Sequence, residues 1–180
     1  MGIFPAPFTP GFVMNLWPLE QGLGIAANLA IIGALLIAAW QSRVATMQLL
    51  EERTSRKMSR SLQFLSRWNM IEFAKYRAPL YDFLVRNPSL ADLLARIKED
   101  PEFFAALRFT LNFYEELGVT YNRNELDRAA IKDFFEGQIE FLHANAIAFI
   151  EDYRRTRKEE RLFSEFCLMW QAIHSRSNQR

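Results

Sequence analysis

The segment LGIAANLAIIGALLIAAW, from Leu23 to Trp40, decides the fold of this chain, because Asn28 is its only polar residue. An α-helix rises ~1.5 Å per residue, so a helix of this length nearly crosses the ~30 Å hydrocarbon layer of a membrane. Trp17 and Trp40 flank the segment, where aromatic rings anchor a helix at the two membrane interfaces. The sequence therefore predicts a single-pass protein that is tethered to the lipid bilayer.

The distribution of charge predicts the orientation of this helix. No Lys or Arg precedes Arg43, so all 22 basic residues follow the apolar segment. Basic residues beside a span resist translocation, so we expect the N-terminus outside and the C-terminal part in the cytoplasm. A cleaved signal peptide is the alternative, but it needs a basic start and a shorter apolar core. The one cysteine, Cys167, agrees with a reducing compartment, and its apolar neighbours indicate a buried thiol.

Small residues recur at every fourth position of the span and therefore share one helix face. Such a face lets two membrane helices approach closely, and an amide in hydrocarbon seeks a hydrogen bond with a partner helix. The alternative interpretation is that alanine is only a common filler of apolar helices. The predicted helix–helix interface consists of Gly22, Ala26, Asn28, Ala30, Ala34 and Ala38.

The tail before the span, residues 1–20, is rich in proline and aromatic side chains. Proline blocks regular helix, and aromatic rings prefer an interface to water. We expect the rings either to lie on the outer lipid headgroups or to pack against a neighbouring membrane subunit. The predicted contact residues of this tail are Phe4, Phe8 and Phe12.

Beyond the transmembrane helix (residues 21–42), the sequence predicts helices only. We expect a polar helical stalk over 43–62, a cytoplasmic helical bundle over 63–174, and a frayed tail over 175–180. Apolar residues recur at three- and four-residue spacing, and no stretch alternates convincingly with period two. The fold class is therefore all-α, with one N-terminal transmembrane helix continuing into a cytoplasmic helical bundle.

Neither glycine nor proline occurs from Ala34 to Ala78, so the membrane helix could run on into the cytoplasm as a stalk. Three- and four-residue apolar spacing then predicts a helix that ends near Arg86. Its spacing predicts one inward face beyond the stalk. The residues expected on that face are Phe64, Trp68, Ile71, Ala74, Ala78 and Tyr81.

Turn residues predict the ends of the later helices. Asn87 and Asp100, each followed by proline, are expected to cap the next two helices, and Gly118 is expected to stop the second of them. Asn124, with Asp127 three residues further on, is expected to open the last long helix.

The usual enzyme motifs are missing from the sequence. The nearest approach to a metal motif is Glu140 with His143, the Glu-x-x-His spacing of di-iron sites, but such sites need a second motif and Gln171 precedes His174. We therefore expect no catalytic residue, no metal and no cofactor, and we interpret His143 as a surface or capped histidine. After the span, 22 basic residues against 21 acidic residues less Glu20 give a net charge of +2, so no basic face indicates nucleic acid.

Several short motifs together resemble a bacterial family that is known only as domain of unknown function 4760. The resemblance covers about residues 62–170 and implies a helical fold behind one N-terminal membrane span, without an accepted activity. The motifs that carry it are Trp68-Asn69, Phe73, Tyr76-Arg77, Leu111-Asn112-Phe113-Tyr114-Glu115-Glu116-Leu117-Gly118, and Phe149-Ile150 followed by Arg154.

Three hypotheses about function follow. The leading one is a non-catalytic accessory or structural subunit of a larger membrane protein complex, which docks onto integral membrane subunits by its transmembrane helix and outer tail. A homo-oligomer is a further possibility for the same contact surfaces. The alternatives are a membrane-anchored signalling or defence sensor, in which the stalk relays a change, and a metal-dependent enzyme that uses Glu140 and His143.

Overall fold

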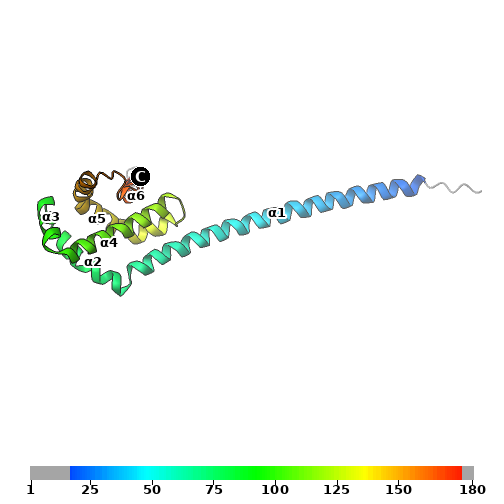
Figure 1. Cartoon of the computed structure of the whole chain (residues 1–180). Coiled ribbons are helices and arrows are strands. Elements are labelled where there is room, and N and C mark those ends of the chain that lie inside the picture. Colours follow the sequence, from blue (N-terminus) through cyan, green and yellow to red (C-terminus); the bar gives the residue numbers. More distant parts are fainter. Residues whose placement is uncertain (1–16, 176–180) are drawn as a thin grey trace, which may run out of the picture. The chain divides into compact units, whose positions relative to one another are not determined.

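The computed structural model describes the backbone of residues 17–175 and the side chains of residues 29–175. These residues form six α-helices and no strand, so the all-α prediction is confirmed (Figure 1). The chain divides into two compact units, Met1–Leu50 and Glu51–Arg180. The helices are α1 (Trp17–Trp68), α2 (Ile71–Leu84), α3 (Leu90–Glu99), α4 (Pro101–Asn122), α5 (Arg128–Arg157) and α6 (Ser164–His174).

The first unit contains the apolar part of α1. Among the helices that the structure describes, α1 is the one that is long and apolar enough to cross a membrane. Its most apolar window of 18 residues has a mean hydropathy of 1.5, and none of that window is buried inside the protein. Length and composition therefore allow α1 to span a bilayer.

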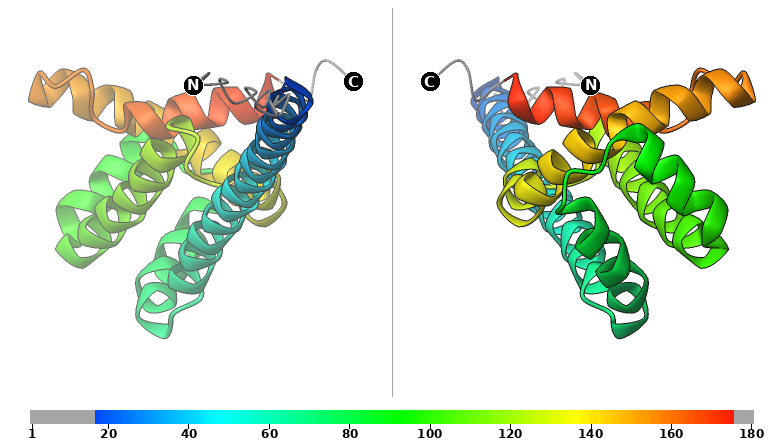
Figure 2. Two further views of the ribbon diagram at one scale, coloured as in Figure 1. Left: turned by 90° about the vertical axis from the view of Figure 1, so that its right-hand side faces the viewer. Right: turned by 90° about the vertical axis from the view of Figure 1, so that its left-hand side faces the viewer.

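The second unit is built around α4. The most extensive contacts of α4 are with α6, and α4 also packs against α2 and α3, while α5 packs against α3 and α6. Figure 2 shows α6, coloured red, lying against α4. The core between these helices is rich in large aromatic and aliphatic side chains, and the largest of the fully buried ones include Tyr114, Phe113, Phe135, Phe149 and Phe166.

The expectation of one helix from Phe64 to about Arg86 is wrong, because α1 ends at Trp68 and α2 begins at Ile71. Met70 between them is extended, with φ −63° and ψ 142°. A contact from the next helix holds this break, since the Arg77 guanidinium donates to the Trp68 carbonyl at 3.2 Å and lies 4.1 Å from the Trp68 ring centroid. No glycine or proline is needed, because a side chain satisfies the carbonyl that the broken helix leaves free.

The break changes which side of α2 faces the core. Ile71 is 83% exposed and Ala78 is also exposed, so both are misplaced by the prediction of one continuous inward face. Phe73, Leu80 and Leu84 are buried instead. Trp68, before the break, is buried as predicted.

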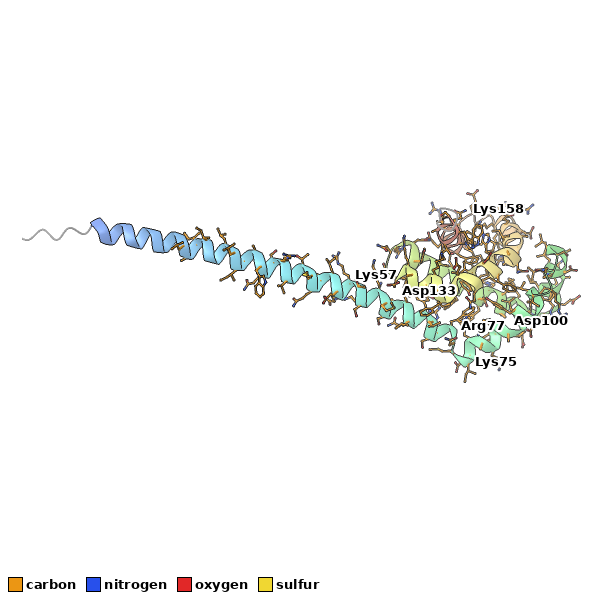
Figure 3. The ribbon with its side chains drawn as sticks, turned by 180° about the vertical axis from the view of Figure 1, so that it is seen from behind. Lys57, Lys75, Arg77, Asp100, Asp133 and Lys158 are labelled. Carbon is orange, nitrogen blue, oxygen red and sulfur yellow. The ribbon has the colours of Figure 1, made fainter. Side chains whose placement is uncertain are left out.

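The helix starts are corrected at two of the three predicted caps. Asp100, labelled in Figure 3, caps α4 as predicted, because its carboxylate accepts from the Phe103 N–H at 3.0 Å. Ser89 rather than Asn87 caps α3. Asp127 rather than Asn124 caps α5. Asn87 and Asn124 take left-handed conformations, with φ 49° and φ 59°, which places them in the turns before the caps.

Gly118 does not stop a helix, because α4 runs through it to Asn122. A Cβ at this position would lie 2.5 Å from the backbone carbonyl of Glu165 at the start of α6. Gly118 is therefore required for the close approach of two helix backbones, and its role is in packing rather than in termination.

Candidate functional site

The predicted contact face on α1 is exposed where the structure describes it. Ala30, Ala34 and Ala38 are all exposed, and a Cβ at Gly33 would have no atom of this chain within 4 Å. Trp40, the predicted anchor at the inner interface, is 67% exposed. Nothing in the described part of the protein covers this face.

The remaining residues predicted on the membrane side lie at the edge of the described chain or outside it. Trp17 is the first residue of α1. The backbone of Gly22, Ala26 and Asn28 is helical, but the side chains of residues 17–28 lie outside the description. The tail residues Phe4, Phe8 and Phe12 lie outside the described residues entirely.

Apolar side chains surround the apolar segment of α1, with the large ones outside the face of Ala30, Ala34 and Ala38. Those that are exposed include Leu29, Ile31, Ile32, Leu35, Leu36 and Ile37. Soluble proteins rarely expose an apolar surface this continuous, and a helix that is apolar all round is found in a protein core or in lipid. By length and composition, this surface fits a membrane span.

The side chain of Glu115 on α4 holds the start of α6. Its two carboxylate oxygens accept from the backbone N–H groups of Glu165 and Phe166, at 3.3 and 2.9 Å. These N–H groups have no acceptor of their own within the helix, and the residue at the N-cap, Phe163, provides no side-chain cap. Burial raises the pKa of Glu115, and the two N–H donors oppose that rise.

Asn122 and Gly118 complete this contact between α4 and α6. The Asn122 amide donates to the Glu165 carbonyl at 3.1 Å and to the Glu165 carboxylate at 2.8 Å. Gly118 allows the two backbones to approach. Three polar or small residues on successive turns of α4 therefore position one helix start, and each of them has a structural role.

Removing the Glu115 carboxylate is expected to weaken this contact measurably. Glu115→Ala leaves two backbone donors without a protein acceptor, and an unpaired buried donor costs ~1–3 kcal/mol. Glu115 lines an open surface hollow with Asn112 and Leu162, so water can replace part of the contact. We expect a loss of about 1–2 kcal/mol in the free energy of unfolding, measured by denaturant titration of the full chain in detergent.

An unchanged free energy of unfolding in Glu115→Ala would contradict this assignment. The matched control is Glu136→Ala on α5, whose carboxylate is paired with Lys132 at 3.5 Å on the same helix. A pair of this kind contributes ~0.3–0.5 kcal/mol, so the control is expected to have a much smaller effect.

Arg154 on α5 connects the loop after α5 to α6. Its Nε donates to the Leu162 carbonyl at 2.7 Å, and its Nη2 lies 3.6 Å from the Cys167 sulfur. Cys167 is half-buried rather than fully buried as predicted, and burial raises the pKa of its thiol. A raised pKa keeps the thiol protonated, which makes it a poor nucleophile.

The residues considered for a metal site are not brought together. Glu140 is exposed, and the His143 ring stacks on Trp170 with 3.8 Å between the ring centroids and 3° between the planes. Glu116 pairs with Arg67 on α1 at 2.6 Å. Among the residues whose side chains the structure describes, 29–175, no group of three or more His, Cys, Asp or Glu side chains is placed to hold a metal ion.

Residues 28–171 match the model of the family described as domain of unknown function, DUF4760. The chain belongs to this family. The matched range begins well before residue 62, so the DUF4760 region includes most of the apolar segment of α1, whereas the aromatic tail lies outside it. Comparison with curated proteins and with solved structures gave no match.

Several residues of the motifs that indicated DUF4760 from the sequence form contacts between helices. The Trp68 ring is covered by Arg77, Glu115 caps α6, and Gly118 allows the close approach of α6. Sequence reasoning missed the roles of these residues, because each partner lies on another helix. The same holds for the pair of Arg67 with Glu116, whose residues are 49 positions apart.

Proposed function

We propose that this protein is a membrane-anchored, non-catalytic accessory or structural subunit that docks onto a larger membrane protein complex through α1. The observation that carries the proposal is the exposed apolar segment of α1, none of which is buried by the rest of the described chain. Lipid covers most of such a helix, and the small-residue face of Ala30, Ala34 and Ala38 suits close contact with another helix.

The second unit supports a structural rather than a chemical role. Several charged side chains of the types that catalytic sites use form internal contacts instead. Glu115 binds the start of α6, Arg154 donates to the Leu162 carbonyl, and Arg77 donates to the Trp68 carbonyl. An enzyme site needs such groups directed at a substrate. We infer that the surface of this unit contacts a partner protein on the cytoplasmic side.

The position of the membrane and the orientation of the chain belong to the same proposal. Every basic residue of the sequence follows the apolar segment, beginning at Arg43. Because basic residues beside a span are retained on the cytoplasmic side, we propose a single span in the inner membrane, with the N-terminus outside. The tail residues Phe4, Phe8 and Phe12 would then add contacts on the outer side.

The test is to fill the small-residue face and to observe whether the partner is lost. In Ala30→Leu with Ala34→Leu, two bulky side chains separate the helix backbones, so co-purification of the partner is expected to fall while the second unit stays folded. The measurement is gentle detergent extraction, native-gel separation and mass spectrometry of the proteins that migrate with the chain.

Ala39→Leu is the matched control for Ala34→Leu alone. At ~100° per residue, Ala39 lies on a different side of α1 from Ala34, and both are exposed. We expect the complex to survive Ala39→Leu. Equal retention of the partner in all three variants would contradict docking through this face, and a chain that migrates only with itself would favour a homo-oligomeric sensor.

A further inference from the structure

The turn between α1 and α2 is very short, and the local sequence does not favour it (Figure 1). Two residues, Asn69 and Met70, separate the helices, and neither glycine nor proline occurs from Ala34 to Ala78. Met70 stands at the N-cap of α2, but its side chain makes no capping hydrogen bond to the first N–H groups of that helix. Local preference alone therefore favours a continuous helix through this point.

The contacts of α1 with α4 fix the end of α1. The Trp68 ring packs against Phe113 and Tyr114 of α4, with 5.3 and 5.4 Å between the ring centroids. Arg67 of α1 pairs with Glu116 of α4 through two hydrogen bonds of 2.9 and 2.6 Å. These contacts determine where α1 lies on α4, but they do not require that the two helices belong to the same chain.

The residues at the turn lie outside the core. Residues 69–71 are all exposed, and the side chain of Ile71 is 83% exposed. Straightening the turn therefore breaks no buried contact of these three residues. In a continuous helix the Glu72 N–H donates to the Trp68 carbonyl, four residues earlier, which accepts from Arg77 in the bent chain. The hydrogen bond at this carbonyl is thus replaced rather than lost.

We propose that the chain forms a dimer by helix exchange, in which the turn straightens and α1 of each copy packs on α4 of a second copy. The partner is a second copy of this chain, because it offers the same Phe113, Tyr114 and Glu116 to Trp68 and Arg67. Each contact of α1 with α4 is then made again between chains, as in other domain-swapped dimers. The local difference between the two forms is the turn itself.

Two opposing terms decide between the single chain and the exchanged dimer. Each straightened turn replaces a helix end and an uncapped helix start with continuous helix, which favours the dimer. Association costs translational and rotational freedom, which favours the single chain. Anchoring of both copies in one bilayer through α1 reduces this cost, because tethering raises the effective concentration of one copy around the other.

The test asks whether α1 of one chain lies on α4 of another. In a Cys167→Ser background, full chains with Arg67→Cys and full chains with Glu116→Cys are produced together, each with a different affinity tag. Complexes that carry both tags are isolated in mild detergent and treated with a bismaleimide linker. The linker is one that joins the two thiols when both substitutions are in one chain. We expect a covalent dimer from the mixed chains.

Two differently tagged chains that both carry Arg67→Cys are the control, and we expect the linker not to join them. A dimer that forms without exchange, for example through the small-residue face of α1, also fails to give the mixed product. In such a dimer the α1 of each chain stays on its own α4, so the two thiols lie on different bundles.

Ile71→Pro distinguishes the bent form from the straight form. Ile71 is the first residue of α2, where proline is favoured, and Met70 before it has φ −63° and ψ 142°, the extended conformation that a following proline requires. In the interior of a continuous helix, proline lowers the helical population by about a hundredfold or more. We expect Ile71→Pro to remove the covalent dimer while far-ultraviolet circular dichroism shows a folded chain. Ile71→Ala permits both forms and is expected to keep the covalent dimer.

Three results would each overturn the proposal. They are no covalent dimer from the mixed chains, an undiminished covalent dimer in Ile71→Pro, and loss of the covalent dimer in Ile71→Ala. The exchange goes beyond the proposed docking and does not use Ala30 or Ala34. The same covalent dimer is therefore expected in Ala30→Leu with Ala34→Leu, so the two proposals are tested separately.

Discussion

Replacing Trp68 by alanine is expected to lower the free energy of unfolding of the second unit by about 3–5 kcal/mol. Trp68 is 6% exposed, and its ring centroid lies 5.0 Å from that of Phe73, 5.3 Å from Phe113 and 5.4 Å from Tyr114. Loss of the ring leaves a large cavity between α1, α2 and α4. It also removes the surface on which the Arg77 guanidinium rests.

This loss is a large part of the total stability, because domains of this kind are stable by only ~5–15 kcal/mol. The measurement is denaturant unfolding of the full chain in detergent, followed by far-ultraviolet circular dichroism. Trp40→Ala is the matched control, since Trp40 is largely exposed on the apolar part of α1 and is expected to leave the unfolding of the second unit unchanged. Equal effects of the two substitutions on the free energy of unfolding would contradict the position of Trp68 at the centre of the core.

The second large effect is expected for Gly118→Ala, which places a methyl group 2.5 Å from the Glu165 carbonyl and 2.8 Å from the Phe166 nitrogen. These atoms belong to a helix backbone, so α6 as a whole has to move away from α4. Overpacking costs ~1–3 kcal/mol and occasionally more, whereas alanine gains only ~1 kcal/mol over glycine in a helix. The steric term exceeds the helical preference, so we expect a net loss of about 2 kcal/mol or more in the free energy of unfolding.

Gly137→Ala is the control that isolates the steric term of this prediction. Gly137 lies inside α5, and a Cβ there would have no atom within 4 Å. The same substitution is expected to stabilise the protein by about 0.5–1 kcal/mol at this position. A stabilising Gly118→Ala, measured by the same denaturant titration, would show that α4 and α6 do not approach as closely as 2.5 Å implies.

Alanine is expected to change the free energy of unfolding in opposite directions at Gly118 and Gly137, and local sequence does not predict this difference. In both cases a glycine stands within a run of helix-forming residues, and local preference alone favours alanine at both. At Gly118 the sequence suggested a helix end, but the helix continues for another turn. The backbone of α6, some fifty residues later, decides that only glycine fits.

For the predicted contact face on α1, the sequence and the structure each supply one part. The spacing of Ala30, Ala34 and Ala38 follows from the sequence, and the structure adds that the rest of the described chain leaves this face exposed. The identity of the partner is not encoded in the spacing, since close approach of two helices requires only small side chains. The co-purification experiment therefore carries that part of the proposal.

The sequence by itself determined the helical class, the apolar segment of α1 and the start of α4 at Asp100, because composition, periodicity and capping depend on residues within a few positions of one another. The tertiary structure decided the break after Trp68, the need for glycine at position 118, and the stacking of His143 and His174 on Trp170. In each of these cases, at least one of the groups that fix the outcome lies on another helix. Such contacts form only when the helices pack together, so no local sequence pattern predicts them.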